Sequence, residues 1–137
     1  MSEFIVCRLA SKTFALNFVE VEEVMNARKG TPLPFSESWH EGMVTIRGDV
    51  FTILNLRKKL LLPASSESSE DKMILLSRAK IALLVDQVED TASALDSQLK
   101  SNEEEWQREL FPTVLEHQGA LVPVIDMDAF LASTKTN

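Results

Sequence analysis

The chain has 137 residues, 45% of them hydrophobic, and carries a formal net charge of −7. This acidic balance argues against a nucleic-acid partner, because binding to a phosphate backbone needs Lys and Arg gathered on one face. No stretch approaches the roughly 18 apolar residues of a membrane-spanning helix, and residues 1–4 lack the basic start of a secretion signal, so we expect a soluble cytoplasmic chain without membrane insertion.

Short strands and breaks alternate in the first part of the chain. The apolar runs 4–9 and 13–18 predict a hairpin, because a turn-length segment separates them. Over 19–26 the spacing of apolar residues fits a turn of helix and an irregular strand equally well. After two prolines, we expect one helical turn over 36–41 that ends at Gly42.

The only cysteine, Cys7, lies inside the first apolar run. A single cysteine cannot form an internal disulfide, and an apolar strand offers the thiol no activating neighbour. We therefore expect a buried, unreactive thiol.

A second hairpin is predicted from the runs 43–46 and 50–54, which flank Arg47-Gly48-Asp49. Asn55 follows and is expected to cap a short helical turn. Residues 63–71, rich in Ser and Glu, have little to bury and predict a solvated link.

The second half of the chain follows the same plan. We expect Trp106 and Leu110 to anchor a short helix and Asp126 to cap the last helical turn. The expected segments are strands over 72–77 and 81–85, a join over 91–99 and 102–109, and strands over 111–116 and 121–125.

Two segments of the sequence occur twice. FALNFVEVEE at 14–23 recurs as IALLVDQVED at 81–90, and VFTILNLRKKL at 50–60 recurs as LVPVIDMDAFL at 121–131. Because both matches keep their order and nearly their spacing, one supersecondary unit has been used twice. We expect a mainly β chain of two small closed barrels. They form one domain, 1–137, with subdomains at about 13–62 and 72–125. Terminal segments of one subdomain can be exchanged with the other.

No group of side chains predicts catalysis, a metal site or a cofactor site. His40 and His117 lie in an expected turn and a hairpin end, without ligand spacing, so we expect solvated histidines. Asp86, Glu89 and Asp90 allow a cation site or a small hydrolase as an alternative. We favour a solvated acidic edge, because no nucleophile or ligand set accompanies them.

Glu23 and Arg47 are expected to meet if the first barrel closes. Glu23 follows the second strand, and Arg47 begins the turn of the second hairpin. A carboxylate and a guanidinium that meet in this way form a charge-assisted pair. The alternative is two independent surface charges, and we favour the pair because Arg47 lies beside apolar Val44 and Ile46.

These motifs resemble the CheW family of bacterial chemotaxis coupling proteins over nearly the whole chain, from about 4 to 131. The most specific match is GMVTIRGDVFTILNLR at 42–57, which is similar to the family segment G-V-x-N-L-R-G-x-V-x-P-V-x-D-L-R. VEEV at 21–24, LVDQV at 84–88 and the tail 122–131 resemble further family elements.

The resemblance implies a non-catalytic scaffold of two intertwined, five-stranded, SH3-like barrels. It implies two partners, the cytoplasmic tip of a chemoreceptor and the regulatory domain of the histidine kinase CheA, with location at receptor arrays on the inner membrane. Carried over by position, the partner-binding residues are Val21, Glu23, Gly42, Arg47 and Gly48, with Asp86 and Val88 lining a groove between the barrels.

The chain departs from the family pattern at several positions. Thr45-Ile46 replaces Asn-Leu, Thr52 replaces Pro, Asn55 replaces Asp, and Gln87 stands where many members have Gly. These departures leave a second interpretation open, in which the chain is a CheW-like regulatory module of a divergent kinase pathway, such as one for surface motility, or of a larger kinase or response-regulator fusion.

Overall fold

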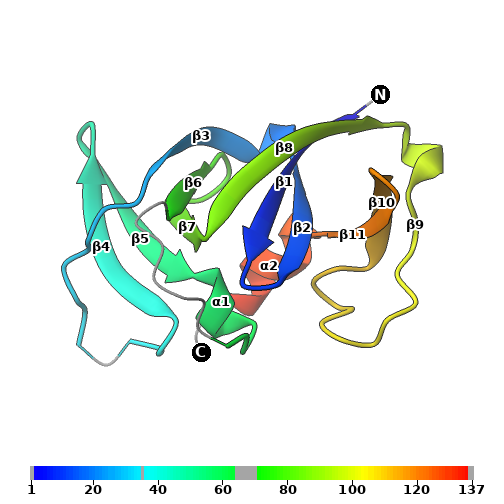
Figure 1. The fold of residues 1–137 in the computed structure, drawn as a ribbon. Helices are drawn as coiled ribbons and strands as arrows, with labels where there is room; N and C mark the ends of the chain where they lie inside the picture. The colour runs from blue at the N-terminus through cyan, green and yellow to red at the C-terminus, as the bar shows by residue number, and fades with distance from the viewer. Residues whose placement is uncertain (1, 35, 64–70, 136–137) are drawn as a thin grey trace. The chain divides into compact units, whose positions relative to one another are not determined.

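The computed structural model describes residues 2–34, 36–63 and 71–135, and most of these lie in strands (Figure 1). None of the described helices is long and apolar enough to cross a membrane. The elements are β1 (Ser2–Leu9), β2 (Lys12–Asn17), η1 (Phe18–Glu20), β3 (Val21–Asn26), β4 (His40–Ile46), β5 (Asp49–Asn55), α1 (Leu56–Lys59), β6 (Lys72–Leu76), β7 (Ile81–Val85), β8 (Gln87–Ala94), η2 (Asp96–Gln98), β9 (Lys100–Ser101), β10 (Thr113–His117), β11 (Ala120–Val124) and α2 (Met127–Ser133).

The described strands form two sheets, and each sheet takes strands from both repeats. One has five strands in the order β3-β6-β7-β5-β4, and the other has six in the order β8-β1-β2-β11-β10-β9. The expected count of five holds for the first sheet only, because the two-residue strand β9 adds to the second. In each sheet a parallel pair joins the repeats, β5 with β7 in one and β11 with β2 in the other.

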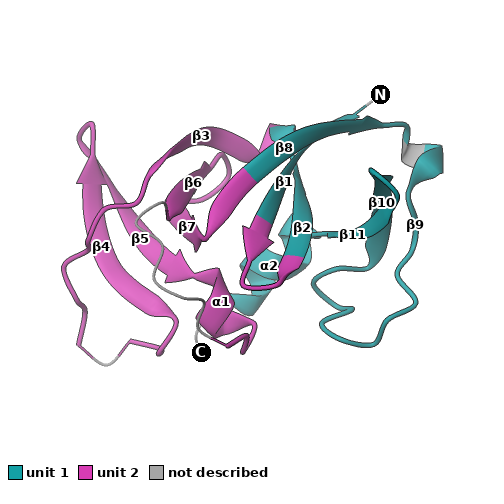
Figure 2. Cartoon of the chain, in the orientation of Figure 1, with its two compact units in different colours: residues 1–7, 13–18, 89–137 teal, residues 8–12, 19–88 magenta. Residues whose placement is uncertain are grey.

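By contact the chain divides into two compact units (Figure 2). Unit 1 contains residues 1–7, 13–18 and 89–137, and unit 2 contains residues 8–12 and 19–88. Neither unit coincides with the subdomains expected at about 13–62 and 72–125, and that division stays a prediction about the repeats.

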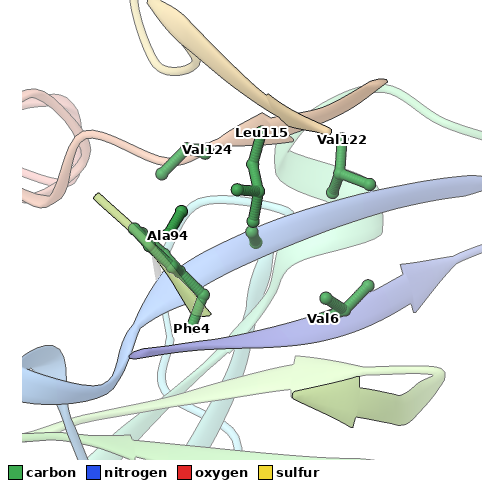
Figure 3. Packing of buried hydrophobic residues seen from close by; sticks show 7 residues of the cluster. Phe4, Val6, Ala94, Leu115, Val122 and Val124 are labelled. Atoms are coloured by element: carbon green, nitrogen blue, oxygen red, sulfur yellow. The ribbon is translucent and has the colours of Figure 1, made fainter. Parts of the chain in front are cut away.

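Each unit has its own apolar core. In unit 1, Phe4 and Val6 of β1 pack with residues of β2, β8, β10 and β11 (Figure 3). In unit 2, Phe51 and Ile53 of β5 pack with Met73 and Leu75 of β6. Ile5 and Ile74, which lie between these side chains and face the opposite side of their strands, are buried too, so β1 and β6 are covered on both faces. Cys7 is fully buried, and burial raises its pKa to about 12, so the expected core thiol is confirmed.

The repeats seen in the sequence have matching structures. β5 leads into α1, and β11 leads into α2. The side chain of Asn55 accepts a hydrogen bond from the Lys58 N–H, and the side chain of Asp126 accepts one from the Ala129 N–H. Both expected caps are therefore confirmed, because each satisfies an N–H group that has no partner inside its helix.

Three local expectations need correction. Residues 36–41 contain one hydrogen-bonded turn, in which the His40 N–H donates to the Glu37 carbonyl oxygen, but it ends before Gly42 because β4 begins at His40 and pairs with β5. The join expected over 91–99 includes part of a strand, since β8 runs to Ala94 in the six-stranded sheet. The helix expected near Trp106 is a series of turns, in which the Trp106 ring stacks on Phe111 at 6.0 Å between centroids.

The segment 19–26, left open between helix and strand, contains both: η1 ends at Glu20 and β3 follows. Of the link expected over 63–71, residues 64–70 lie outside the described part of the chain.

Candidate partner-binding site

Glu23 and Arg47 form a two-pronged ion pair within unit 2. The guanidinium donates from Nη2 to Glu23 Oε1 at 2.5 Å and from Nη1 to Oε2 at 3.3 Å. The carboxylate hydrogen bond, and then its charge, raise the pKa of Arg47 further above its ordinary value. The predicted pair is confirmed. Because 65% of the Arg47 side chain is exposed, the pair is accessible and adds little stability.

The turn between β4 and β5 fixes the backbone position from which the Arg47 side chain extends. Arg47 and Gly48 both have positive φ, at 49° and 87°, as a two-residue turn with right-handed strand twist requires. The left-handed conformation is easy for Gly48 and costs Arg47 some energy. The turn therefore presents Arg47 at the hairpin end, where it reaches Glu23 on β3.

Gly42 has a structural role in β4. Its φ is 104°, and a Cβ built there would lie 2.3 Å from the carbonyl oxygen of Thr31. The ladder with β5 also shifts register between His40 and Gly42, which marks a β-bulge. The segment around Thr31 pairs with Met43 across this close approach. Any side chain at position 42 would push this segment away.

Val21 begins β3 next to a second irregularity. The pairing with β6 shifts between Val21 and Glu23, and Val21 itself is half-buried opposite Leu76. The bulge changes the direction of the β3 side chains beside the Glu23 carboxylate. Thus Val21, Glu23, Arg47 and Gly48 belong to strand starts and turns of unit 2, with the Glu23–Arg47 contact joining them.

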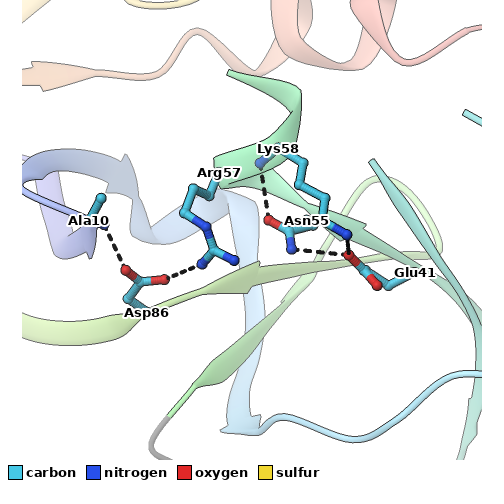
Figure 4. Close-up of polar contacts among 6 residues, drawn as sticks. All are labelled: Ala10, Glu41, Asn55, Arg57, Lys58 and Asp86. Carbon is cyan, nitrogen blue, oxygen red and sulfur yellow. Dashed lines mark hydrogen bonds and ion pairs between the residues drawn. The ribbon is translucent and has the colours of Figure 1, made fainter. Parts of the chain in front are cut away.

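Asp86 is held by a different set of residues (Figure 4). Its Oδ1 accepts a hydrogen bond from Arg57 Nη1 at 3.0 Å, and its Oδ2 accepts one from the Ala10 N–H at 2.6 Å. The Arg57 and Asp86 side chains are only 18% and 10% exposed. Burial raises the pKa of Asp71, and the nearby charge of Asp86 raises it further, whereas the charge of Arg57 lowers it. Val88 follows on β8 and is half-buried.

Sequence reasoning missed Arg57 and the cluster around Asn55. The Asn55 amide donates from Nδ2 to Glu41 Oε1 at 3.0 Å, and Lys58 Nζ lies 2.8 Å from the same oxygen (Figure 4). Arg57 is the last residue of the family-like segment 42–57, and that position was the signal that could have identified it. Nothing in the sequence pointed to Glu41, because its partners lie on another strand and a helix.

The carboxylates considered for a cation site have other partners. Asp90 accepts hydrogen bonds from Thr91 N–H and the Gln118 amide, and its Oδ2 lies 3.0 Å from His117 Nε2. His117 is thus half-buried, with 19% of its side chain exposed, rather than solvated as expected. Among the described residues, no three His, Cys, Asp or Glu side chains gather as a metal ion would need.

The comparison with family models decides the assignment: the CheW-like domain model matches residues 3–135. The chain belongs to this family. The chemotaxis protein CheW of Bacillus subtilis is 25% identical over 134 residues, covering 94% of this chain and 86% of that protein. The chemotaxis protein CheW of Rhizobium meliloti is 24% identical over 137 residues, covering 96% and 88%.

A solved structure shows the same fold. The scaffolding protein TtCheW from Thermoanaerobacter tengcongensis superposes with a TM-score of 0.86 at 18% identity, covering 98% of this chain and 95% of that one. The expected class, mainly β with SH3-like subdomains, is therefore confirmed as the CheW fold.

Proposed function

We propose that this CheW-family chain is a non-catalytic adaptor that couples chemoreceptors to a CheA-type histidine kinase. The single observation that carries the proposal is the family match across residues 3–135. Adaptor function needs exposed contact surfaces and no reacting groups. Each proposed contact can be weak, because arrays of receptors and kinases raise the effective concentration of every partner.

The proposed partners are the cytoplasmic tip of a chemoreceptor and the regulatory domain of the kinase. The proposed location is the cytoplasm, at receptor arrays on the inner membrane. Val21, Glu23, Gly42, Arg47 and Gly48 are proposed as the binding region. The exposed, charged Glu23–Arg47 pair supports this choice, because a rim charge pair sets partner orientation more than fold stability.

Co-sedimentation tests the proposal. The purified chain is mixed with membranes that contain a chemoreceptor and with CheA, and the pelleted fraction and kinase activity are measured. An adaptor enters the pellet only when the membranes contain the receptor, and it changes kinase activity. A chain that stays in the supernatant and leaves kinase activity unchanged contradicts the proposal.

The departures from the family pattern fit a second candidate equally well, a CheW-like module of a divergent kinase pathway such as one for surface motility. Asn55 in place of Asp is the clearest case, since its amide donates to Glu41 and an Asp could not. Pelleting with kinase of one pathway and not another separates the two candidates.

A further inference from the structure

Asp86 connects three segments of unit 2 that are distant in sequence. Its Oδ1 binds Arg57 at the start of α1, and its Oδ2 binds the N–H of Ala10 in the turn between β1 and β2 (Figure 4). Its own backbone N–H donates to the carbonyl oxygen of Arg8 at 3.1 Å. We call residues 8–12 the hairpin tip; unit 2 includes this tip, while most of β1 and β2 belongs to unit 1.

The burial of these contacts makes them costlier to break than a surface ion pair. Asp86 is 10% exposed and Arg57 is 18% exposed at the side chain. In such surroundings a carboxylate that loses a partner keeps its desolvation cost, so breaking one bond is expensive. Both carboxylate oxygens already accept a hydrogen bond within the chain, and little of the side chain is left for a partner to touch.

The backbone of the hairpin tip is strained at Ala10. Ala10 has a φ of 55°, in the left-handed region that residues with a Cβ rarely adopt. A charge-assisted bond from the Ala10 N–H to Asp86 Oδ2 stabilises that conformation. The Arg8 guanidinium also donates a hydrogen bond to the side chain of Gln87, the residue after Asp86. This bond is a second contact between the hairpin tip and the segment that contains Asp86.

We propose that Asp86 is a positioning residue for partner binding, which acts by holding the hairpin tip and the start of α1 in place rather than by touching a partner. This inference rests on the adaptor function proposed above and deepens it. It assigns a different role to Asp86 from the groove contact that the family resemblance implies, and Arg57 and Ala10 are the residues through which Asp86 acts.

The test combines local structure with binding in the full-length chain. Asp86→Asn removes the charge and one acceptor, and Arg57→Gln removes the guanidinium but leaves the hydrogen bond that the Ala10 N–H donates to Asp86. Glu89→Gln is the matched control, since it removes an exposed carboxylate nearby. Amide hydrogen exchange of Ala10 is measured in the free protein, with Leu83 of β7 as internal reference. Binding to a receptor-tip fragment and to the kinase regulatory domain is measured by titration calorimetry.

A positioning role predicts that Asp86→Asn speeds exchange at Ala10 about tenfold or more relative to Leu83 and weakens binding by a similar factor. Arg57→Gln weakens binding too, and the double variant is no worse than the stronger single variant, because both act through one contact. Glu89→Gln changes neither measurement.

Other results overturn the inference. If Asp86→Asn weakens binding while exchange at Ala10 stays unchanged, Asp86 touches the partner directly. If exchange at Ala10 rises while binding is unaffected, the hairpin tip has no role in binding. If the wild-type chain binds neither fragment, the adaptor proposal fails, whereas the exchange at Ala10 still reports whether Asp86 holds the tip. Should Asp86→Asn not fold, Arg57→Gln alone decides: unchanged binding contradicts the proposal.

Discussion

Asn55 donates a hydrogen bond to Glu41 through the same side chain that caps α1. Its Oδ1 accepts from the Lys58 N–H at 3.1 Å, and its Nδ2 donates to Glu41 Oε1 at 3.0 Å. An Asp at this position could not do both at neutral pH, because an ionised carboxylate accepts hydrogen bonds and donates none. Asp126, the matching cap in the second repeat, uses its Oδ1 for the Ala129 N–H.

Asn55→Asp should therefore destabilise the chain although Asp is a good N-cap. The substitution loses the bond to Glu41 and sets two carboxylates beside each other at a buried position. We expect the free energy of unfolding to fall by about 1–3 kcal/mol at pH 7 in urea titrations. Asp126→Asn, the matched control, should change it by well under about 1 kcal/mol. Glu41→Gln added to Asn55→Asp should restore most of the loss, and no restoration would contradict this account.

Reversing the Glu23–Arg47 pair tests binding rather than folding. Glu23→Arg and Arg47→Glu should each reduce co-sedimentation with receptor membranes, because each leaves like charges facing each other. The urea midpoint of each variant should stay near that of wild type, since 65% of the Arg47 side chain is exposed. If the double reversal recovers none of the lost co-sedimentation, the two charges act separately.

Substitutions of two adjacent leucines should have different effects on the free energy of unfolding. Leu60 is 1% exposed, whereas Leu61 is 87% exposed with a φ of 60°. Leu60→Ala should lower the free energy of unfolding by about 2–5 kcal/mol through the cavity it leaves. Leu61→Asn should leave it unchanged or raise it by up to about 1 kcal/mol, since Asn tolerates the left-handed region. A loss of stability with Leu61→Asn would show that Leu61 packs on something in solution.

The Asp90 carboxylate gives a pH-dependent contribution to stability. The Thr91 N–H bond, followed by the bond to His117, lowers the pKa of Asp90 in the folded chain. A carboxylate whose pKa is lowered by folding adds stability at pH values above its unfolded pKa of about 3.9. This added stability is lost as the pH falls through the folded pKa. The urea midpoints of wild type and Asp90→Asn should therefore differ at pH 7 and converge as the pH falls below the unfolded pKa and through the folded one. A difference that grows as the pH falls would contradict this sign.

The Cys7 thiol should resist labelling in the folded chain. Its pKa of about 12 leaves almost no thiolate at pH 8, and its side chain is fully buried. Reaction with a thiol reagent should be slow in buffer and complete within minutes in concentrated urea. Fast labelling in buffer would show that β1 opens readily.

Some features of the fold depend on residues close together in sequence, and these were predictable. The hairpins around Arg47-Gly48 and Gln118-Gly119 follow from turn residues between apolar runs, and the caps Asn55 and Asp126 follow from helix-end chemistry. The strand β8 was missed because its sequence, QVEDTASA, has few apolar residues and no clear alternation. Its hydrogen bonds to a neighbouring strand, which propensity does not encode, decide its conformation.

The sequence by itself determined the duplicated plan, the strand pairs in each hairpin, the family and the Glu23–Arg47 pair. Only the tertiary structure decided that β5 of the first repeat pairs with β7 of the second, that β11 pairs with β2, and that Asp86 binds Arg57 and Ala10. The physical reason is that local turns and caps are set by neighbouring residues. Parallel pairing and a buried carboxylate's partners depend on segments that meet only when the whole chain has folded.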